Sequence, residues 1–105
     1  MNKSYNRTII IGRLGANPIE KNGCAVFPIL NTTWDAENHK DEVQCHKVWT
    51  SGKQTPLVMR HLNKGDLCCI EGSLTNTDGK VSIHAERITF LSAKKSSEVA
   101  SQESN

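Results

Sequence analysis

The sequence predicts an all-β fold, a barrel of five strands with one short helix between the third and the fourth strand. Five segments combine β-branched or aromatic residues with alternation at every second position, and turn residues separate them. One segment, between the third and the fourth, instead has apolar residues at helical spacing between helix-end signals. The length of 105 residues is that of one domain with a single modest core.

The first strand is predicted near the N-terminus, within residues 6–20, which read NRTIIIGRLGANPIE. The β-branched run 8–11 favours an extended chain, Gly12 interrupts it, and Asn17 with Pro18 is a turn signal. We therefore expect a strand that glycine interrupts and that a turn ends.

The second and third strands are predicted to form a hairpin. Residues 24–34 form the second strand, in which Pro28 is allowed at an edge or bulge. The charged segment 35–42 is the loop at the tip, and residues 42–51 form the third strand. Alternation on that strand predicts two faces: Val43, Cys45, Lys47, Trp49 and Ser51 on one, and Gln44, His46, Val48 and Thr50 on the other.

The helix is predicted to begin after Gly52, which ends the third strand. Thr55 followed by Pro56 has the pattern of an N-cap with proline at the first helical position. The segment 63–65, Asn-Lys-Gly, supplies a basic last turn and a glycine stop, so the helix has two to three turns. Its predicted apolar face consists of Leu57, Val58, His61 and Leu62.

The last two strands are predicted at 66–75 and 80–91, joined by the hairpin turn signal 77–79. Gly72 is expected to form a bulge or bend. Three strands, a helix and two strands are the element order of the five-stranded oligonucleotide/oligosaccharide-binding (OB) barrel. We assign residues 1–92 to this domain and 93–105 to a disordered polar tail.

The composition indicates a soluble cytoplasmic protein. No apolar run reaches the ~20 residues of a membrane-spanning helix, and the first residues, MNKSYN, lack the apolar region of a signal peptide. Hydrophobic residues make up 36% of the chain, so we expect that part of it is unpacked or that the domain gains burial by oligomerising.

Cysteine and histidine spacing does not predict a metal site. Four cysteines and four histidines are present, but no ligand pair has zinc-finger spacing. The closest pair, Cys45 and His46, falls on opposite faces of a strand. We expect the cysteines to act as small hydrophobic residues, and we expect no metal and no cofactor. No catalytic set of side chains is visible, so we do not predict an enzyme.

Charge is segregated along the chain, although the formal net charge is only +2. Residues 43–65 contain four basic residues and no Asp or Glu, whereas 35–42, reading DAENHKDE, is acid-rich. A local basic face is therefore compatible with a near-neutral total. The four basic residues are Lys47, Lys53, Arg60 and Lys64.

Five ordered blocks of the chain resemble the bacterial single-stranded DNA-binding protein (SSB) family. They correspond to the family's first strand and turn, its second strand, the motif around the third-strand histidine, the helix exit and the fourth strand. In this sequence the blocks are residues 6–20, 23–34, 46–53, 62–65 and 70–74. The resemblance covers the whole predicted barrel and implies the OB fold.

The resemblance also implies binding of single-stranded DNA in replication, recombination or repair, with little sequence preference. Such binding uses aromatic platforms and a cationic groove along the phosphates. Trp34 corresponds to a stacking tryptophan of the family, and three lysines correspond to basic positions. The candidate DNA-binding residues are Trp34, Lys47, Trp49, Lys53, Lys64 and Arg13. The alternatives are a loop-edge hydrophobic residue for Trp34, a core aromatic for Trp49 and solubilising charge for each lysine.

A subunit interface is implied as well. His46 corresponds to a family histidine at that interface, and the family's dimers use the first strand there. We expect a homodimer or homotetramer, with His46, Asn6, Thr8 and Ile10 as candidate interface residues. The alternative for His46 is a core or surface position within one subunit.

The chain departs from the family in its aromatics and its tail. Cys45 and Ser51 stand where the family has aromatic residues, and the hairpin segment 74–79 is short. Each lost platform removes about 1–3 kcal/mol of stacking, so we expect weaker binding that falls steeply with salt. The tail lacks the family's acidic Pro-Phe tip, so we expect no recruitment of enzymes through it.

Two other hypotheses follow from these departures. In size the chain resembles primosomal replication protein N, a dimeric adaptor in replication restart, and partners among restart or mobile-element replication proteins are expected in that case. The other hypothesis is a barrel that has lost DNA binding and serves as a protein-interaction module. In each case we expect a bacterial cytoplasmic, nucleoid-associated protein that does not bind membranes.

Overall fold

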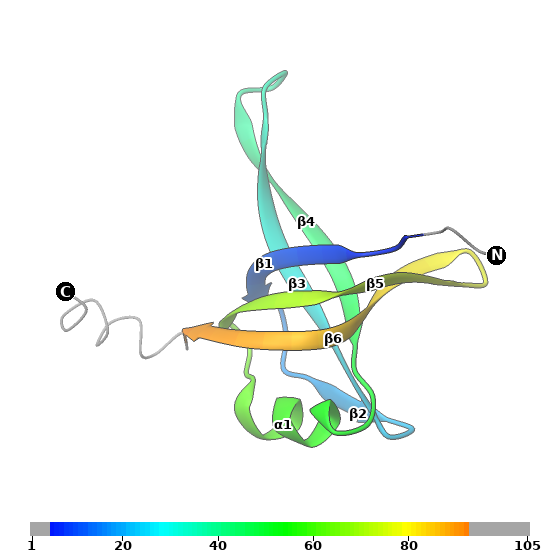
Figure 1. The fold of residues 1–105 in the computed structure, drawn as a ribbon. Helices are drawn as coiled ribbons and strands as arrows, with labels where there is room; N and C mark the ends of the chain where they lie inside the picture. The colour runs from blue at the N-terminus through cyan, green and yellow to red at the C-terminus, as the bar shows by residue number, and fades with distance from the viewer. Residues whose placement is uncertain (1–4, 93–105) are drawn as a thin grey trace.

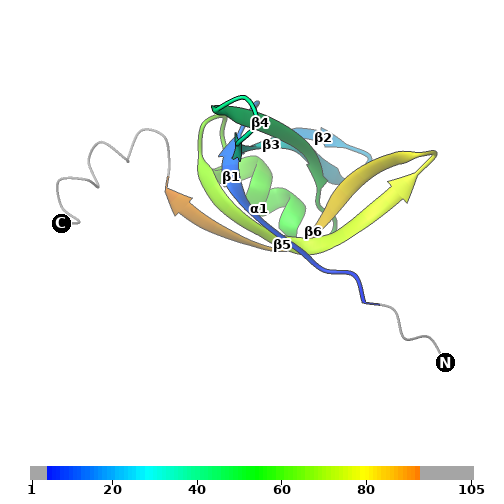
Figure 2. The same cartoon turned by 90° about the horizontal axis from the view of Figure 1, so that it is seen from above.

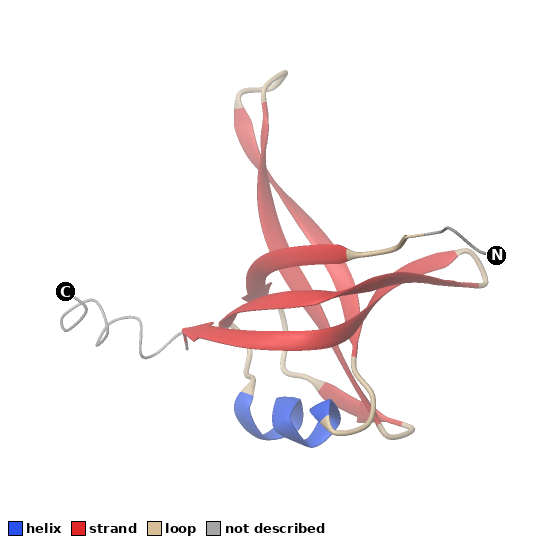
Figure 3. Ribbon diagram, in the orientation of Figure 1, coloured by secondary structure: helices blue, strands red, loops and turns tan. Residues whose placement is uncertain are grey.

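The computed structural model describes residues 5–92, and the predicted disordered tail, 93–105, lies outside the described residues. Within this range the chain is almost entirely β-structure with one helix (Figure 3). The elements are β1 (Thr8–Leu14), β2 (Ile19–Lys21), β3 (Cys24–Asp35), β4 (Lys40–Trp49), α1 (Gln54–His61), β5 (Leu67–Thr77) and β6 (Lys80–Ser92).

The strands form one sheet that closes into a barrel, which confirms the predicted OB fold. The strand order is β1-β5-β6-β4-β3-β2, and an additional β1–β3 pairing closes the sheet on itself. Neighbouring strands are antiparallel except β4 and β6, which are parallel. The short β2 was not predicted; it pairs only with β3, so the barrel itself has five strands. Helix α1 lies at one end of the barrel (Figures 1 and 2).

Gly12 lies where β1 passes from one neighbouring strand to another. β1 pairs with β5 up to Arg13 and with β3 at Arg13 and Leu14. A Cβ at Gly12 would lie 2.2 Å from the carbonyl oxygen of Leu30, a backbone atom. The glycine therefore permits a close approach of β1 to β3, and the strand continues through it instead of being interrupted.

The β5–β6 hairpin contains the predicted bulge and the predicted turn. The register between the two strands shifts at Glu71 and Gly72, which confirms the bulge at Gly72. Thr77 pairs with Lys80, so Asp78 and Gly79 form a two-residue turn. Both turn residues have positive φ, 55° and 79°, as a turn that matches the strand twist requires.

The predicted start of the helix is wrong. Thr55 is not the N-cap; it lies inside α1, and the cap position is Lys53, which makes no side-chain capping bond. Thr55 is buried instead, and its hydroxyl donates to the carbonyl of Gly23 at 3.0 Å and contacts the hydroxyl of Thr50 at 3.1 Å. The role of this hydroxyl is set by partners outside the helix, and the local Thr-Pro pattern gives no sign of them.

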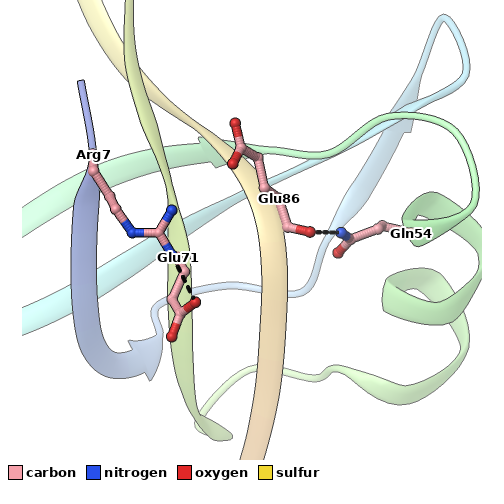
Figure 4. Close-up of polar contacts among 4 residues, drawn as sticks. All are labelled: Arg7, Gln54, Glu71 and Glu86. Carbon is pink, nitrogen blue, oxygen red and sulfur yellow. Dashed lines mark hydrogen bonds and ion pairs between the residues drawn. The ribbon is translucent and has the colours of Figure 1, made fainter. Parts of the chain in front are cut away.

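The apolar face of α1 is narrower than predicted. Val58 and Leu62 are buried in the barrel core, but Leu57 is 51% exposed and His61 is also exposed. At the start of the helix, the side-chain amide of Gln54 donates to the backbone carbonyl of Glu86 on β6 (Figure 4). The helix is therefore held by Val58, Leu62 and the buried Thr55, with the other apolar residues left at the surface.

The β3–β4 hairpin extends away from the barrel as an arm (Figure 1). The acid-rich segment was predicted to be a loop, but β3 continues to Asp35 and β4 begins at Lys40. The loop therefore spans only residues 36–39, and the other half of the predicted loop is paired strand.

The core lies inside the barrel and is made by alternate residues of the strands together with Val58 and Leu62 from α1 and its C-terminal end. It consists of Ile10, Leu14, Ala25, Phe27, Ile29, Val48, Val58, Leu62, Cys68, Ile70, Ile83 and Ala85. Outside the barrel, Arg7 forms an ion pair with Glu71 at 3.2 Å, which joins the approach to β1 with β5 (Figure 4). Both side chains are partly exposed, so this pair contributes at most about 1 kcal/mol.

Candidate nucleic-acid interface

The outer face of the β3–β4 hairpin forms one continuous surface. Phe27 and Ile29 of β3 and Val48 of β4 point into the core, so the residues between them point outward. The register then places these outer residues in cross-strand pairs: Val26 with Trp49, Pro28 with Lys47, Leu30 with Cys45, Thr32 with Val43 and Trp34 with Asp41. The grouping of Lys47 with Trp49 on one face, predicted from alternation, is confirmed.

The two tryptophans lie at opposite ends of this outer face. Trp49 pairs with Val26, and Trp34 lies eight positions further along β3. At the rise of a β-strand this separation is about 26 Å along the strand. At about 3.4 Å per nucleotide along one strand of a duplex, this length corresponds to about eight nucleotides, and OB folds bind about 4–16 nucleotides of single strand.

Trp49 is half-buried and held by neighbouring strands, and it is not part of the core. Its indole ring stacks on the imidazole of His84 on β6, with centroids 4.2 Å apart and planes inclined by 23°. The indole N–H donates to the hydroxyl of Thr75 on β5 at 3.2 Å. The imidazole Nε2 in turn lies 3.1 Å from the hydroxyl of Ser51.

A groove crosses the outer face at the Trp49 end. One hollow of about 400 Å³ is lined by Val26, Lys47, Trp49, Thr77, Asp78, Lys80, Val81 and Ser82. A second of about 380 Å³ is lined by Ala16, Asn17, Ile19, Val26, Phe27, Pro28, Cys45, Lys47 and Val81. Because Val26, Lys47 and Val81 line both, the hollows form one groove from the β5–β6 turn to the segment 16–19.

The groove brings together some of the predicted basic residues and adds one. Lys47 is exposed at its centre, and Lys80 lines it from β6. Lys80 was missed because the sequence gives no sign that the β5–β6 turn faces β4. Asp78, on the same turn, is the carboxylate that lines the groove.

Arg13 and Lys64 lie together near the other end of this groove. The Arg13 guanidinium donates to the carbonyl of Gly65 at 2.9 Å, and the backbone N–H of Lys64 donates to the side chain of Asn17 at 2.7 Å. Asn17 lines the groove. Lys53 is exposed at the start of α1 and lines neither hollow.

Trp34 lies on the arm among carboxylates. Its side chain is 61% exposed and meets the ring of His39 edge-on, with centroids 6.4 Å apart. Asp41 pairs with it across the hairpin, and Asp35 follows it in the chain. The side-chain amide of Asn38 donates to Asp35 at 2.8 Å and lowers the pKa of that carboxyl. Asp41 lies on the outer face with Trp34, whereas Asp35 points to the other side of the strand. The Trp34 end of the hairpin, with the acid-rich segment 35–42, is acidic, and the Trp49 end, with Lys47 and Lys80, is basic.

The residues predicted for a subunit interface take different positions. Ile10 is buried in the core of its own barrel, so its side chain is not at the surface. The side-chain amide of Asn6 donates to and accepts from the backbone of Leu74, at 2.8 and 3.0 Å. Thr8 and His46 are half-buried.

The exposed apolar side chains of β1 point to the side of the strand opposite to that of Ile10. Ile9 is 60% and Ile11 is 53% exposed. Ile11 borders a hollow of about 340 Å³, which Leu30 and Val43 of the outer face also line. The surface of β1 that a second subunit can contact is therefore that of Ile9 and Ile11.

The described residues contain no group of three His, Cys, Asp or Glu side chains placed to hold a metal ion. Burial raises the pKa of the Cys68 thiol to about 12, so this thiol stays protonated and is not a nucleophile at neutral pH. In the part of the chain that the structure describes, no helix is long and apolar enough to cross a membrane.

Comparisons with known proteins give one family match and similar folds. The profile of the single-strand binding protein family matches residues 5–91. The fold is similar to that in a Plasmodium falciparum SSB complex with single-stranded DNA, with a TM-score of 0.72, 23% identity and coverage of 87% of this chain and 98% of that one. It is equally similar to a small single-stranded DNA-binding protein from Streptomyces coelicolor, with a TM-score of 0.72, 16% identity and coverage of 85% and 95%. No curated protein sequence matches the chain.

Proposed function

Since the chain belongs to the single-strand binding protein family, we propose that it binds single-stranded DNA during replication, recombination or repair, with little sequence preference. It is a binding protein and not an enzyme. The observation that carries the proposal is the groove, in which the Trp49 ring lies beside Lys47 and Lys80. In OB folds this face of the barrel binds oligonucleotides, between the loop after the first strand and the loop between the last two strands. Here these are the segment 16–19 and the β5–β6 turn.

The groove offers the two interactions that single-strand binding needs. A base stacks on the exposed part of the Trp49 ring, because every base has a π-face and the contact does not depend on sequence. Lys47 and Lys80 line the same hollow from two strands and contact phosphates on either side of that base. Arg13 and Lys64 extend the cationic path past Asn17, and Lys53 lies further away and contributes to the general attraction.

Trp34 supplies a second base platform on the arm. Its exposure favours stacking, but the carboxylates around it repel phosphates. We therefore propose that the strand enters at the groove and reaches Trp34 only when the salt concentration is high enough to screen the acidic tip.

Two subunits or four form the active species in this proposal, with the exposed isoleucines of β1 and His46 at the interface. The groove lies on the β3–β4 face of each subunit. We place the protein in the bacterial cytoplasm, at the nucleoid.

The test is a titration of the tryptophan fluorescence with poly-dT at low and high salt. Binding predicts quenching and an affinity that falls steeply as salt rises, because phosphate contacts release counterions. Trp49→Ala should weaken binding by about 1–3 kcal/mol, the value of one stacked base. An unquenched signal and no affinity at low salt would show that the barrel does not bind DNA and would favour the protein-interaction module.

A second candidate, an adaptor similar to primosomal replication protein N, is favoured by the acidic arm. Asp41 lies across the hairpin from an exposed aromatic, and the tip segment 35–42 is acid-rich, which suits a basic protein surface better than a phosphate chain. Pull-down with replication-restart helicases tests it. Retention that Trp34→Ala abolishes, with DNA affinity unchanged, would support the adaptor.

A further inference from the structure

We propose that His84 is a positioning residue for base stacking. Together with Ser51 and Thr75, it holds the Trp49 indole flat against the sheet, so that the free surface of the indole is ready to receive a base. This inference rests on the proposed binding of single-stranded DNA, and it adds residues of β5, of β6 and of the turn after β4 to the site.

Two contacts restrict the Trp49 ring and leave the rest of its surface free. His84 is the cross-strand neighbour of Trp49 on β6, and its imidazole covers one part of the indole at a centroid distance of 4.2 Å. Thr75 accepts the indole N–H at 3.2 Å, which fixes the rotation of the ring in its own plane. The remaining indole surface lines the groove.

Both supporting side chains are themselves held. The imidazole Nε2 of His84 lies 3.1 Å from the hydroxyl of Ser51. The Thr75 hydroxyl lies 2.9 Å from the hydroxyl of Ser82 and 3.3 Å from its carbonyl oxygen, so its proton points to Ser82 and a lone pair points to the indole. The indole is therefore placed by a chain of contacts that reaches back to the sheet.

This arrangement gives Ser51 a role. It stands where the related family has an aromatic residue, and its hydroxyl supports the ring of His84. Ser51 follows Trp49 by two residues on the same side of the chain, and its hydroxyl anchors the ring that supports Trp49. The stacking platform on this face is therefore one tryptophan that a histidine supports.

Holding the ring lowers the entropy that binding must remove. An aromatic side chain that is free before binding and fixed after it reduces affinity by about two- to tenfold. In this protein the restriction is already present in the free state, so the base finds the indole in its stacking orientation.

The test uses Trp34→Phe as the parent, because Trp49 is then the sole tryptophan of the chain. His84→Ala, His84→Phe and Ser51→Ala are made in this parent, with His61→Ala as the matched control. His61 lies on α1 against Phe90, outside the groove. The measurements are the Kd for poly-dT and the fluorescence anisotropy of Trp49 in the free protein.

His84→Ala should raise the Kd by about two- to tenfold and lower the anisotropy of Trp49. His84→Phe keeps a ring under the indole and should restore both, and His61→Ala should change neither. Ser51→Ala should produce a smaller change in the same direction, and because Ser51 is exposed outside the strands, it serves if His84→Ala does not fold.

Two results would overturn the inference while the proposed function stands. In the first, the parent binds poly-dT, and the His84→Ala and Ser51→Ala variants have the same Kd and the same Trp49 anisotropy as the parent. The other is an equal loss in His84→Ala and His84→Phe, since the ring contact would then not be the cause. A parent that does not bind poly-dT at all overturns the proposed function itself.

Discussion

Gly72 shows at the scale of one residue how close packing fixes the identity of a side chain. A Cβ at this position would lie 1.9 Å from the carbonyl oxygen of His84, and a backbone oxygen paired across the bulge cannot move aside. We predict that Gly72→Ala lowers the free energy of unfolding by at least about 1–3 kcal/mol, the cost of overpacking. Urea denaturation measures it. Gly23→Asn is the control, because its site is open and its φ of 80° is tolerated by Asn; equal losses for both variants would contradict the prediction.

Asp35 gives a prediction for the tip of the arm. Its folded pKa is lowered, first by the Asn38 side chain and then by the backbone amides of Asn38 and Glu37, which oppose desolvation. Its contribution to the stability of the tip is therefore present above the unfolded pKa and is lost as pH falls through the folded pKa. We predict that Asn38→Ala raises the pKa of Asp35 towards its ordinary value. An NMR titration of the carboxyl measures this shift, and an unchanged midpoint would contradict the assigned cause.

Sequence patterns predict the position of a residue when that position depends only on the residue's own strand. Alternation is sufficient to place Lys47 and Trp49 on one face, because side chains on a strand alternate whatever its neighbours are. The roles of His84 and Thr55 depend on partners many residues away. No sequence pattern shows such contacts, so the support of Trp49 and the burial of Thr55 were not predicted.

At the scale of elements, the groove is made where β4 meets the β5–β6 hairpin, and each side contributes a lysine. Lys47→Ala and Lys80→Ala should each reduce the slope of log affinity against log salt by about 0.7, the value for one phosphate contact on a single strand. The slope is measured from poly-dT titrations at several salt concentrations. Arg60→Ala on α1, outside the groove, is the control; a slope lowered equally by all three variants would show attraction by net charge without defined contacts.

The elements were predicted where turn and strand signals agree. Asp78 and Gly79 form the predicted turn because two positive φ values suit these residue types and few others. The predicted arm is too short because the charge in 35–42 is typical of a loop, whereas cross-strand pairing tolerates charged residues on a solvated hairpin. β2 was not predicted, since three residues that pair with β3 alone carry no periodic signal.

At the scale of the whole molecule, basic, acidic and apolar surfaces lie in separate regions. The groove is basic and the tip of the arm is acidic, so a net charge of +2 hides two regions of opposite sign. We therefore expect DNA to be directed to the barrel and away from the arm at low salt. The exposed apolar residues of β1 form a third region, which is separate from the groove that contains Trp49.

The oligomer gives the last prediction. Ile9 and Ile11 expose apolar area on a strand that has β5 on one edge and pairs with β3 only at Arg13 and Leu14. Pairing with a second copy would cover both the side chains and the free edge. We predict that light scattering finds a dimer or tetramer and that Tm rises with protein concentration, because only the folded chain associates. Ile9→Lys should give a monomer with a lower Tm that is independent of concentration.

Leu57→Lys is the matched control for Ile9→Lys. Leu57 is an exposed apolar residue of similar accessibility, but it lies on α1, away from β1. Since the interface should use β1, Leu57→Lys should leave the mass unchanged. If the unmodified protein is already a monomer at the highest concentration, the exposed isoleucines serve another purpose; if Leu57→Lys alone dissociates it, the interface is formed by α1. Poly-dT binding by monomeric Ile9→Lys, measured in parallel, then shows whether one barrel is sufficient for the groove to bind DNA.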